Sequence, residues 1–119
     1  MRNALLIAIG GGGGSVLRYL ISRGTNNVSF PVGTLTINLA GSFLIGFLYG
    51  YFSRNNQLGS PFAFLMMTGF CGGFTTFSAY SLESIQLIQT GHVVKALCYA
   101  TASVVFGLLL CWLGKTIGE

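Results

Sequence analysis

Uncharged hydrogen-bond donors lie at helical spacing inside two apolar stretches of this sequence. Thr34, Asn38 and Gly41 occupy positions i, i+4 and i+7 of one stretch, so they would share one face of a helix. Tyr99 and Ser103 are four residues apart in another stretch. Such side chains could bind an ion, or they could be the small and polar residues through which membrane helices pack. An amide deep in an apolar span is costly unless it has a partner, so Asn38 favours a functional role.

The composition indicates that these stretches lie in a membrane. Of the 119 residues, 52% are hydrophobic and 7% are charged, and the mean hydropathy is +0.72. Soluble domains carry about 25% charged residues, so the few charges here cannot solvate a surface. The sequence contains no nucleophile–base pair, metal-ligand cluster or cofactor motif, and we therefore predict neither an enzyme nor a nucleic-acid partner.

Hydropathy predicts an all-α integral membrane protein with four spans, since each span needs about 20 apolar residues. The predicted spans are Asn3–Ile21, Val32–Ser53, Pro61–Ile88 and Val93–Ile117. Polar connections rich in turn-formers join them, at 22–27, 54–61 and 89–92. We expect residues 1–119 to form a single four-helix transmembrane domain of a multi-pass protein in the plasma (inner) membrane.

The basic residues are balanced between the two sides of the membrane. With four spans, the side of the termini holds Arg2, Arg54 and Lys115, and the other side holds Arg18, Arg23 and Lys95. Because orientation follows the Lys and Arg bias of short loops, this chain carries no instruction for one orientation. The balance predicts dual topology and an antiparallel homodimer with lipid as its surroundings.

The third span departs from a plain membrane helix near its middle. Gly72 and Gly73 are followed closely by the β-branched Thr75 and Thr76, which together form a weak point for a helix. A break there would free carbonyl groups, which in transporters often hold a cation. Alternatively, the two glycines simply allow close helix packing.

Glycines elsewhere have the small-xxx-small spacing of closely packed helices. Gly10 and Gly14 form one such pair, and Gly46 and Gly50 form another. We therefore expect close helix approaches in spans one and two.

Two ionisable residues lie within or near the end of a span. Arg18, near the end of span one, either extends to the interface as an anchor or attracts anions to a pore mouth. Glu83 is the only acid inside a span, and we interpret it as a helix-end or vestibule residue rather than a proton carrier.

Four motifs together resemble the CrcB/Fluc family of fluoride channels. They are Gly-Ser-Val-Leu-Arg-Tyr at 14–19, Gly-Thr-Leu at 33–35, Asn-Leu-Ala-Gly-Ser-Phe at 38–43 and Gly-Phe-Cys-Gly-Gly-Phe-Thr-Thr-Phe-Ser at 69–78. The resemblance covers nearly the whole chain, in length, span number and motif order. It implies a dual-topology homodimer with two antiparallel anion pores, a third helix broken near its middle, and passive export of cytoplasmic fluoride.

The resemblance also implies roles for individual residues. The implied pore positions are Asn38, Phe77, Tyr80, Tyr99 and Ser103. Position 80 is a tyrosine here, whereas the family usually has phenylalanine. The resemblance further implies a structural sodium ion (Na+) at the dimer interface, held by the main-chain carbonyls of Gly72 and Thr75 from both subunits.

A fluoride pore would need hydrogen-bond donors, because fluoride is small and strongly hydrated. The hydroxyl of Thr34 adds a donor to the implied set, and Arg18 would lie in the vestibule. Aromatic rings such as that of Phe77 have a positive edge that can face an anion.

Two other functions compete with this interpretation. A small multidrug-type, proton-coupled exporter is also a four-span, dual-topology dimer, but it needs a carboxylate in its first span, and span one contains none. A non-transporting membrane assembly subunit would need neither Asn38 nor a broken helix.

Overall fold

The computed structural model describes residues 1–25 and 30–119, and this part of the chain is helical apart from its connections. Its elements are α1 (Arg2–Thr25), α2 (Val32–Arg54), α3 (Pro61–Ala63), η1 (Phe64–Cys71), α4 (Gly72–Phe74), α5 (Phe77–Gln89) and α6 (Val93–Gly118). Four helical stretches are long and apolar enough to cross a membrane, at Arg2–Thr25, Val32–Arg54, Pro61–Gln89 and Val93–Gly118. The four predicted spans are therefore confirmed, each to within four residues at its ends. Residues 26 and 27 of the first predicted connection lie outside the described residues.

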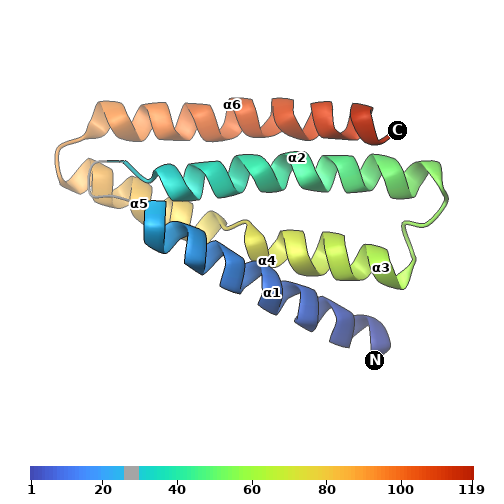
Figure 1. Cartoon of the computed structure of the whole chain (residues 1–119). Helices are drawn as coiled ribbons and strands as arrows, with labels where there is room; N and C mark the ends of the chain where they lie inside the picture. Colours follow the sequence, from blue (N-terminus) through green and yellow to red (C-terminus); the bar gives the residue numbers. More distant parts are fainter. Residues whose placement is uncertain (26–29) are drawn as a thin grey trace.

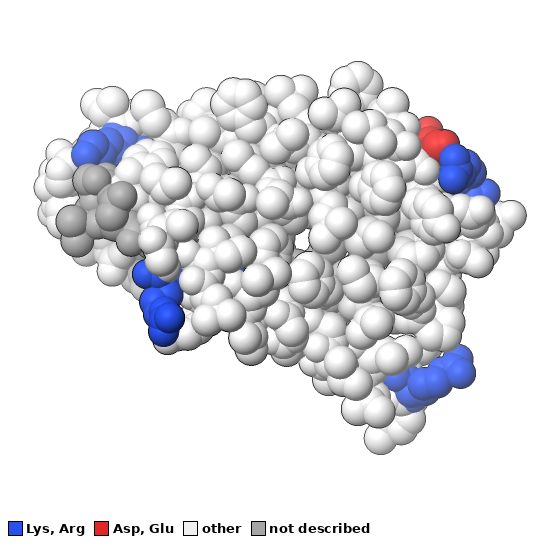
Figure 2. Space-filling view, in the orientation of Figure 1, with Lys and Arg blue, Asp and Glu red and all other residues white. Residues whose placement is uncertain are grey.

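The helices run up and down along one long axis, and the two termini lie at the same end (Figure 1). The connection from α2 to α3 lies at that end too, and the turn from α5 to α6 lies at the other. The protein measures 48 × 29 × 20 Å, so its length matches a bilayer with its headgroups, about 40–45 Å. In Figure 2 the visible charged atoms gather towards the two ends and leave an uncharged middle band. This distribution fits a protein that spans the membrane.

The third span is interrupted near its middle, as the sequence indicated. The helix continues through Gly72, with φ −63° and ψ −38°, and ends at Phe74. The next two residues are extended: Thr75 has φ −83° and ψ 157°, and Thr76 has φ −150° and ψ 123°. The interruption therefore falls on the β-branched threonines rather than on the glycines before them. A feature that the sequence did not predict is that η1, ahead of the break, is a π-helix.

Glycines bring the helices close together in two places. A Cβ added at Gly46 would collide with the carbonyl oxygen of Cys111, so α2 and α6 touch backbone to backbone. A Cβ added at Gly14 would collide with the carbonyl oxygen of Phe70, so α1 touches η1 in the same way. Both contacts involve glycines of the predicted small-xxx-small pairs, and they leave no room for a side chain.

Candidate functional site

The side chain of Asn38 forms hydrogen bonds to the main chain at the break in the third span. Its Nδ2 donates to the carbonyl oxygen of Thr76 at 3.2 Å, and the N–H of Thr76 donates to its Oδ1 at 3.0 Å. The hydroxyl of Thr76 in turn accepts from the N–H of Ala79 at 3.1 Å and caps α5. Buried backbone groups need partners, and the Asn38 amide supplies one to the N–H and one to the carbonyl of Thr76. Asn38 therefore has a structural task in addition to any contact with an ion.

Two side chains of α1 contact the other side of the break. The Ser15 hydroxyl donates to the carbonyl oxygen of Gly73 at 3.3 Å, and Arg18 Nε donates to the same oxygen at 3.2 Å. The backbone contact at Gly14 brings α1 near enough for both bonds. Arg18 thus extends inward to the broken helix, and its expected effect on anions in a vestibule stays a prediction.

A groove of about 360 Å³ lies beside the break and is lined by α2, the third span and α6. Its lining includes the pore residues that the sequence implied, Asn38, Phe77, Tyr80 and Ser103, together with both expected sodium ligands, Gly72 and Thr75.

Two groups in this groove are available for contacts outside the chain. Phe77, at the middle of a membrane span, is 79% exposed and can face lipid or a second copy. The Ser103 hydroxyl oxygen is buried and has no hydrogen-bond partner within the described part of the chain. A buried hydroxyl without a partner carries a desolvation cost unless something else binds it. The groove therefore has the properties of an incomplete binding site.

Thr34 and Tyr99 lie outside the groove and contact Glu83 instead. The Thr34 hydroxyl donates to Glu83 Oε2 at 3.0 Å, and the Tyr99 hydroxyl donates to Oε1 at 3.2 Å. Thr34 is 2% exposed and Tyr99 is fully buried. The sequence analysis missed this cluster and placed Glu83 at a helix end or in a vestibule. The sequence could have indicated the cluster. An acid within an apolar span needs buried donors, and Thr34 and Tyr99 offer hydroxyls in two other spans.

A row of aromatic rings connects the groove to the Glu83 cluster. The ring centroids of Phe77 and Tyr80 are 5.5 Å apart, those of Tyr80 and Tyr99 are 5.1 Å apart, and those of Tyr99 and Phe30 are 5.6 Å apart. Phe77 and Tyr80 line the groove, whereas the Tyr99 hydroxyl contacts Glu83. The two sets of predicted pore residues are therefore adjacent.

Comparison with known proteins gives a consistent result. The family described as "CrcB-like protein, Camphor Resistance (CrcB)" matches residues 5–115. A protein of Flavobacterium psychrophilum is 43% identical over 122 residues, covering 100% of this chain and 98% of its own length. Relatives from Leptospira interrogans and Aquifex aeolicus are 46% and 41% identical over 116 residues, covering 95% of this chain and 91% and 94% of their own lengths. All three relatives are named fluoride-specific ion channels. The chain is a multi-pass membrane protein that belongs to the CrcB-like family.

Proposed function

We propose that this protein is a fluoride-selective ion channel, like the relatives that carry that name. It exports cytoplasmic fluoride passively and works as an antiparallel, dual-topology homodimer with two pores. Family membership and the four membrane spans support the channel function. The groove beside the break supports a pore that passes through this part of the protein.

The observation that carries the proposal is the chemistry of the groove. Its polar side chains are uncharged donors, and the Ser103 hydroxyl has no partner within the described residues. The Asn38 amide has a second N–H besides the one that bonds to Thr76. Fluoride gives up its hydration shell only when donors replace the water, and neutral donors do so without forming a deep charged trap. The exposed ring of Phe77 can add its positive edge.

Dimerisation would complete the groove. In a single chain the groove is open and Phe77 is largely exposed. A second copy in the opposite orientation would cover both, and the balanced basic residues of the sequence favour equal numbers of the two orientations. Two copies contain two such grooves, which gives two pores per dimer.

The Glu83 cluster sets a condition on how Thr34 and Tyr99 could serve the pore. Both hydroxyls donate to the Glu83 carboxylate. A passing anion could use these donors only if the carboxylate released them. We therefore assign the first contact with fluoride to the groove and treat Thr34 and Tyr99 as a second stage, reached along the aromatic row.

The main chain at the break fits the expected structural sodium ion. The N–H of Thr76 would bond to the Gly72 carbonyl in a continuous helix, but it donates to Asn38 instead. Gly72 is exposed in the groove, and Thr75 is extended next to the break. Unwound carbonyls of this kind coordinate sodium in transporters. In the dimer, the carbonyls of Gly72 and Thr75 from both copies would hold the ion, which would neutralise their partial charges at the interface.

No energy coupling is needed for export. An inside-negative membrane potential favours the exit of an anion by about 2.3 kcal/mol per charge per 100 mV. The multidrug-type exporter is disfavoured because α1 contains no carboxylate. A non-transporting assembly subunit would need neither the groove nor the Ser103 hydroxyl that has no partner among the described residues.

Fluoride efflux from liposomes tests the proposal. Purified protein is reconstituted into vesicles loaded with potassium fluoride, and efflux is followed with a fluoride electrode after addition of a potassium ionophore. We expect fast efflux without a pH gradient and little efflux from matched vesicles loaded with chloride. Vesicles that retain fluoride would contradict the proposal, and efflux that requires a pH gradient would favour the proton-coupled exporter.

The Ser103→Ala variant separates a pore role from a packing role. Since the Ser103 hydroxyl has no partner within the described residues, its removal should leave the melting temperature in detergent unchanged or slightly higher. Fluoride efflux should fall about tenfold or more, as expected for a lost donor of about 1.5 kcal/mol. A variant with normal efflux would remove Ser103 from the pore.

A further inference from the structure

A second polar groove lies at the end of the molecule where α6 ends, whereas the break lies near the middle of the third span (Figure 1). This end groove has a volume of about 410 Å³. Its lining comes from the last turns of α2 and α6, namely Tyr49, Gly50, Ser53, Arg54, Lys115 and Glu119. The proposed channel uses none of these residues.

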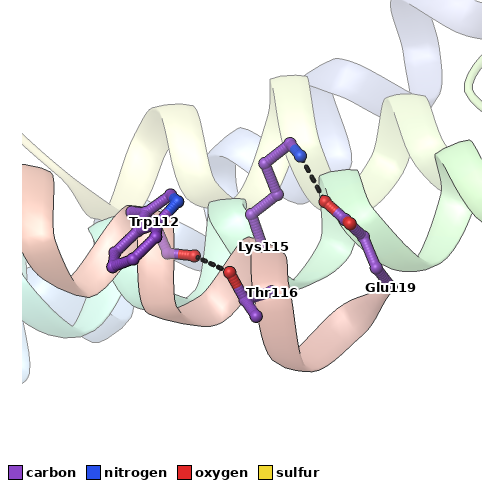
Figure 3. Close-up of polar contacts among 4 residues, drawn as sticks. All are labelled: Trp112, Lys115, Thr116 and Glu119. Atoms are coloured by element: carbon purple, nitrogen blue, oxygen red, sulfur yellow. Dashed lines mark hydrogen bonds and ion pairs between the residues drawn. The ribbon is translucent and has the colours of Figure 1, made fainter.

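Two cations in the end groove converge on one acidic residue. Lys115 Nζ pairs with the Glu119 carboxylate (Figure 3), and Arg54 Nη1 donates to the Glu119 main-chain oxygen at 3.0 Å. The Lys115–Glu119 contact is the one ion pair recorded among residues 1–25 and 30–119, and both side chains are about half exposed, at 47% and 51%. Lys115 therefore already binds a carboxylate of the chain itself, and Arg54 lies beside it on the same residue.

Aromatic residues place the end groove at the depth of lipid headgroups. Trp112, one turn before Lys115, is 68% exposed, and Tyr49 and Tyr51 are each 42% exposed. Tryptophan and tyrosine are enriched where membrane helices cross the interface. Leu108, one turn below Trp112 on the same helix face, is 68% exposed and presents apolar surface towards the bilayer interior. A ligand in the groove could thus keep a polar head at Arg54 and Lys115 and an apolar tail along α6.

We propose that the end groove binds the phosphate of an anionic phospholipid between Arg54 and Lys115, in competition with the Glu119 carboxylate. The guanidinium offers a planar fork of donors that suits phosphate, and the ammonium adds a point charge. Each Lys or Arg near an anionic membrane surface strengthens binding about fivefold. Removing the side-chain carboxylate frees Lys115 for the lipid, whereas the bond from Arg54 to the main-chain oxygen of Glu119 is unaffected.

Lipid titrations on the purified full chain test this proposal. Phosphatidylglycerol is added in detergent, the melting temperature is recorded, and the midpoint of its rise gives an apparent affinity. Arg54→Gln and Lys115→Gln should each weaken this affinity about fivefold. Glu119→Gln should strengthen the affinity for phosphatidylglycerol by a similar factor. A variant that merely damaged the fold would weaken this affinity instead.

The matched control is Arg23→Gln, which removes one positive charge from the end of α1, where Arg23 lies over the Tyr19 ring. This control should keep the affinity of the unmodified chain. Equal stabilisation by phosphatidylcholine or by free inorganic phosphate would overturn the lipid assignment. Unchanged affinity in both Arg54→Gln and Lys115→Gln would overturn the site. Fluoride efflux is not the readout, so these outcomes are independent of the channel proposal.

Discussion

The two halves of the third span are built in opposite ways. Before the break, η1 and α4 pack against α1 through bare backbone: added Cβ atoms at Gly69 and Gly73 would meet the carbonyl oxygens of Ile7 and Gly11. After the break, α5 uses side chains. It presents Glu83 to donors from α2 and α6, and it starts with the exposed ring of Phe77.

This difference separates a rigid part from a part that can contact an ion. Backbone-to-backbone packing leaves no space and no adjustable group, so the first half fixes where the break lies relative to α1. The second half carries rings, hydroxyls and a carboxylate, which can change partners. The break connects the two halves, and Asn38, Ser15 and Arg18 satisfy its polar groups.

The largest expected effect comes from breaking the rigid half. Gly14→Ala would place a methyl group against the carbonyl oxygen of Phe70 and 2.7 Å from the Phe74 nitrogen, and backbone atoms cannot move aside. We expect a loss of about 3 kcal/mol in stability, at the upper end of overpacking costs, measured as a lower melting temperature in detergent. Gly12→Ala is the matched control, since no atom of residues 1–25 or 30–119 lies within 4 Å of its added Cβ. Equal melting temperatures for the two variants would show that α1 does not depend on this contact.

A smaller effect is expected at the connection between the halves. Asn38→Ala leaves the N–H and the carbonyl of Thr76 without their partner, which costs about 2 kcal/mol and should also reduce fluoride efflux. Asn38→Asp keeps an acceptor for the Thr76 N–H but opposes a carboxyl oxygen to the Thr76 carbonyl inside the span, so it should be no more stable than Asn38→Ala and should not recover the efflux. Normal efflux in both variants would mean that Asn38 only supports the break.

The smallest effect is expected in the adaptable half. Tyr80→Phe keeps the ring that lies between those of Phe77 and Tyr99 and removes only the hydroxyl. Stability should change by no more than about 0.5 kcal/mol, and efflux should stay the same if the ring alone contacts the ion. Phe77→Ile in the same assay removes a ring and should reduce efflux. A clear loss in Tyr80→Phe would make the hydroxyl part of the pathway.

Much of the fold could be predicted because its causes are local. Apolar stretches of sufficient length identify the four spans, and the glycine spacing identified helices that pack closely. The break was predicted in the right segment from two glycines followed by two β-branched threonines, and it falls on the threonines. The π-helix could not be predicted, since its sequence has no distinct signature.

The partners of the site residues depend on distances in space that the sequence does not contain. Asn38 bonds to a residue 38 positions away, and Arg18 to one 55 positions away. Periodicity placed Asn38 and Thr34 on one helix face, yet Asn38 meets the break and Thr34 meets Glu83. Sequence patterns therefore found the polar residues but could not sort them into two sites.

The loose winding of η1 has a consequence for insertions and deletions. A π-helix turns through the same angle with more residues than an α-helix, so a chain that lost one residue between 64 and 71 could retighten and keep the later part of the span facing the same way. Helix α1 has no π-helical turn that could retighten. A one-residue deletion midway along it would therefore rotate Arg18 by about 100° relative to the preceding part of the helix. Length changes during divergence should accordingly be tolerated in this segment more readily than in the first span.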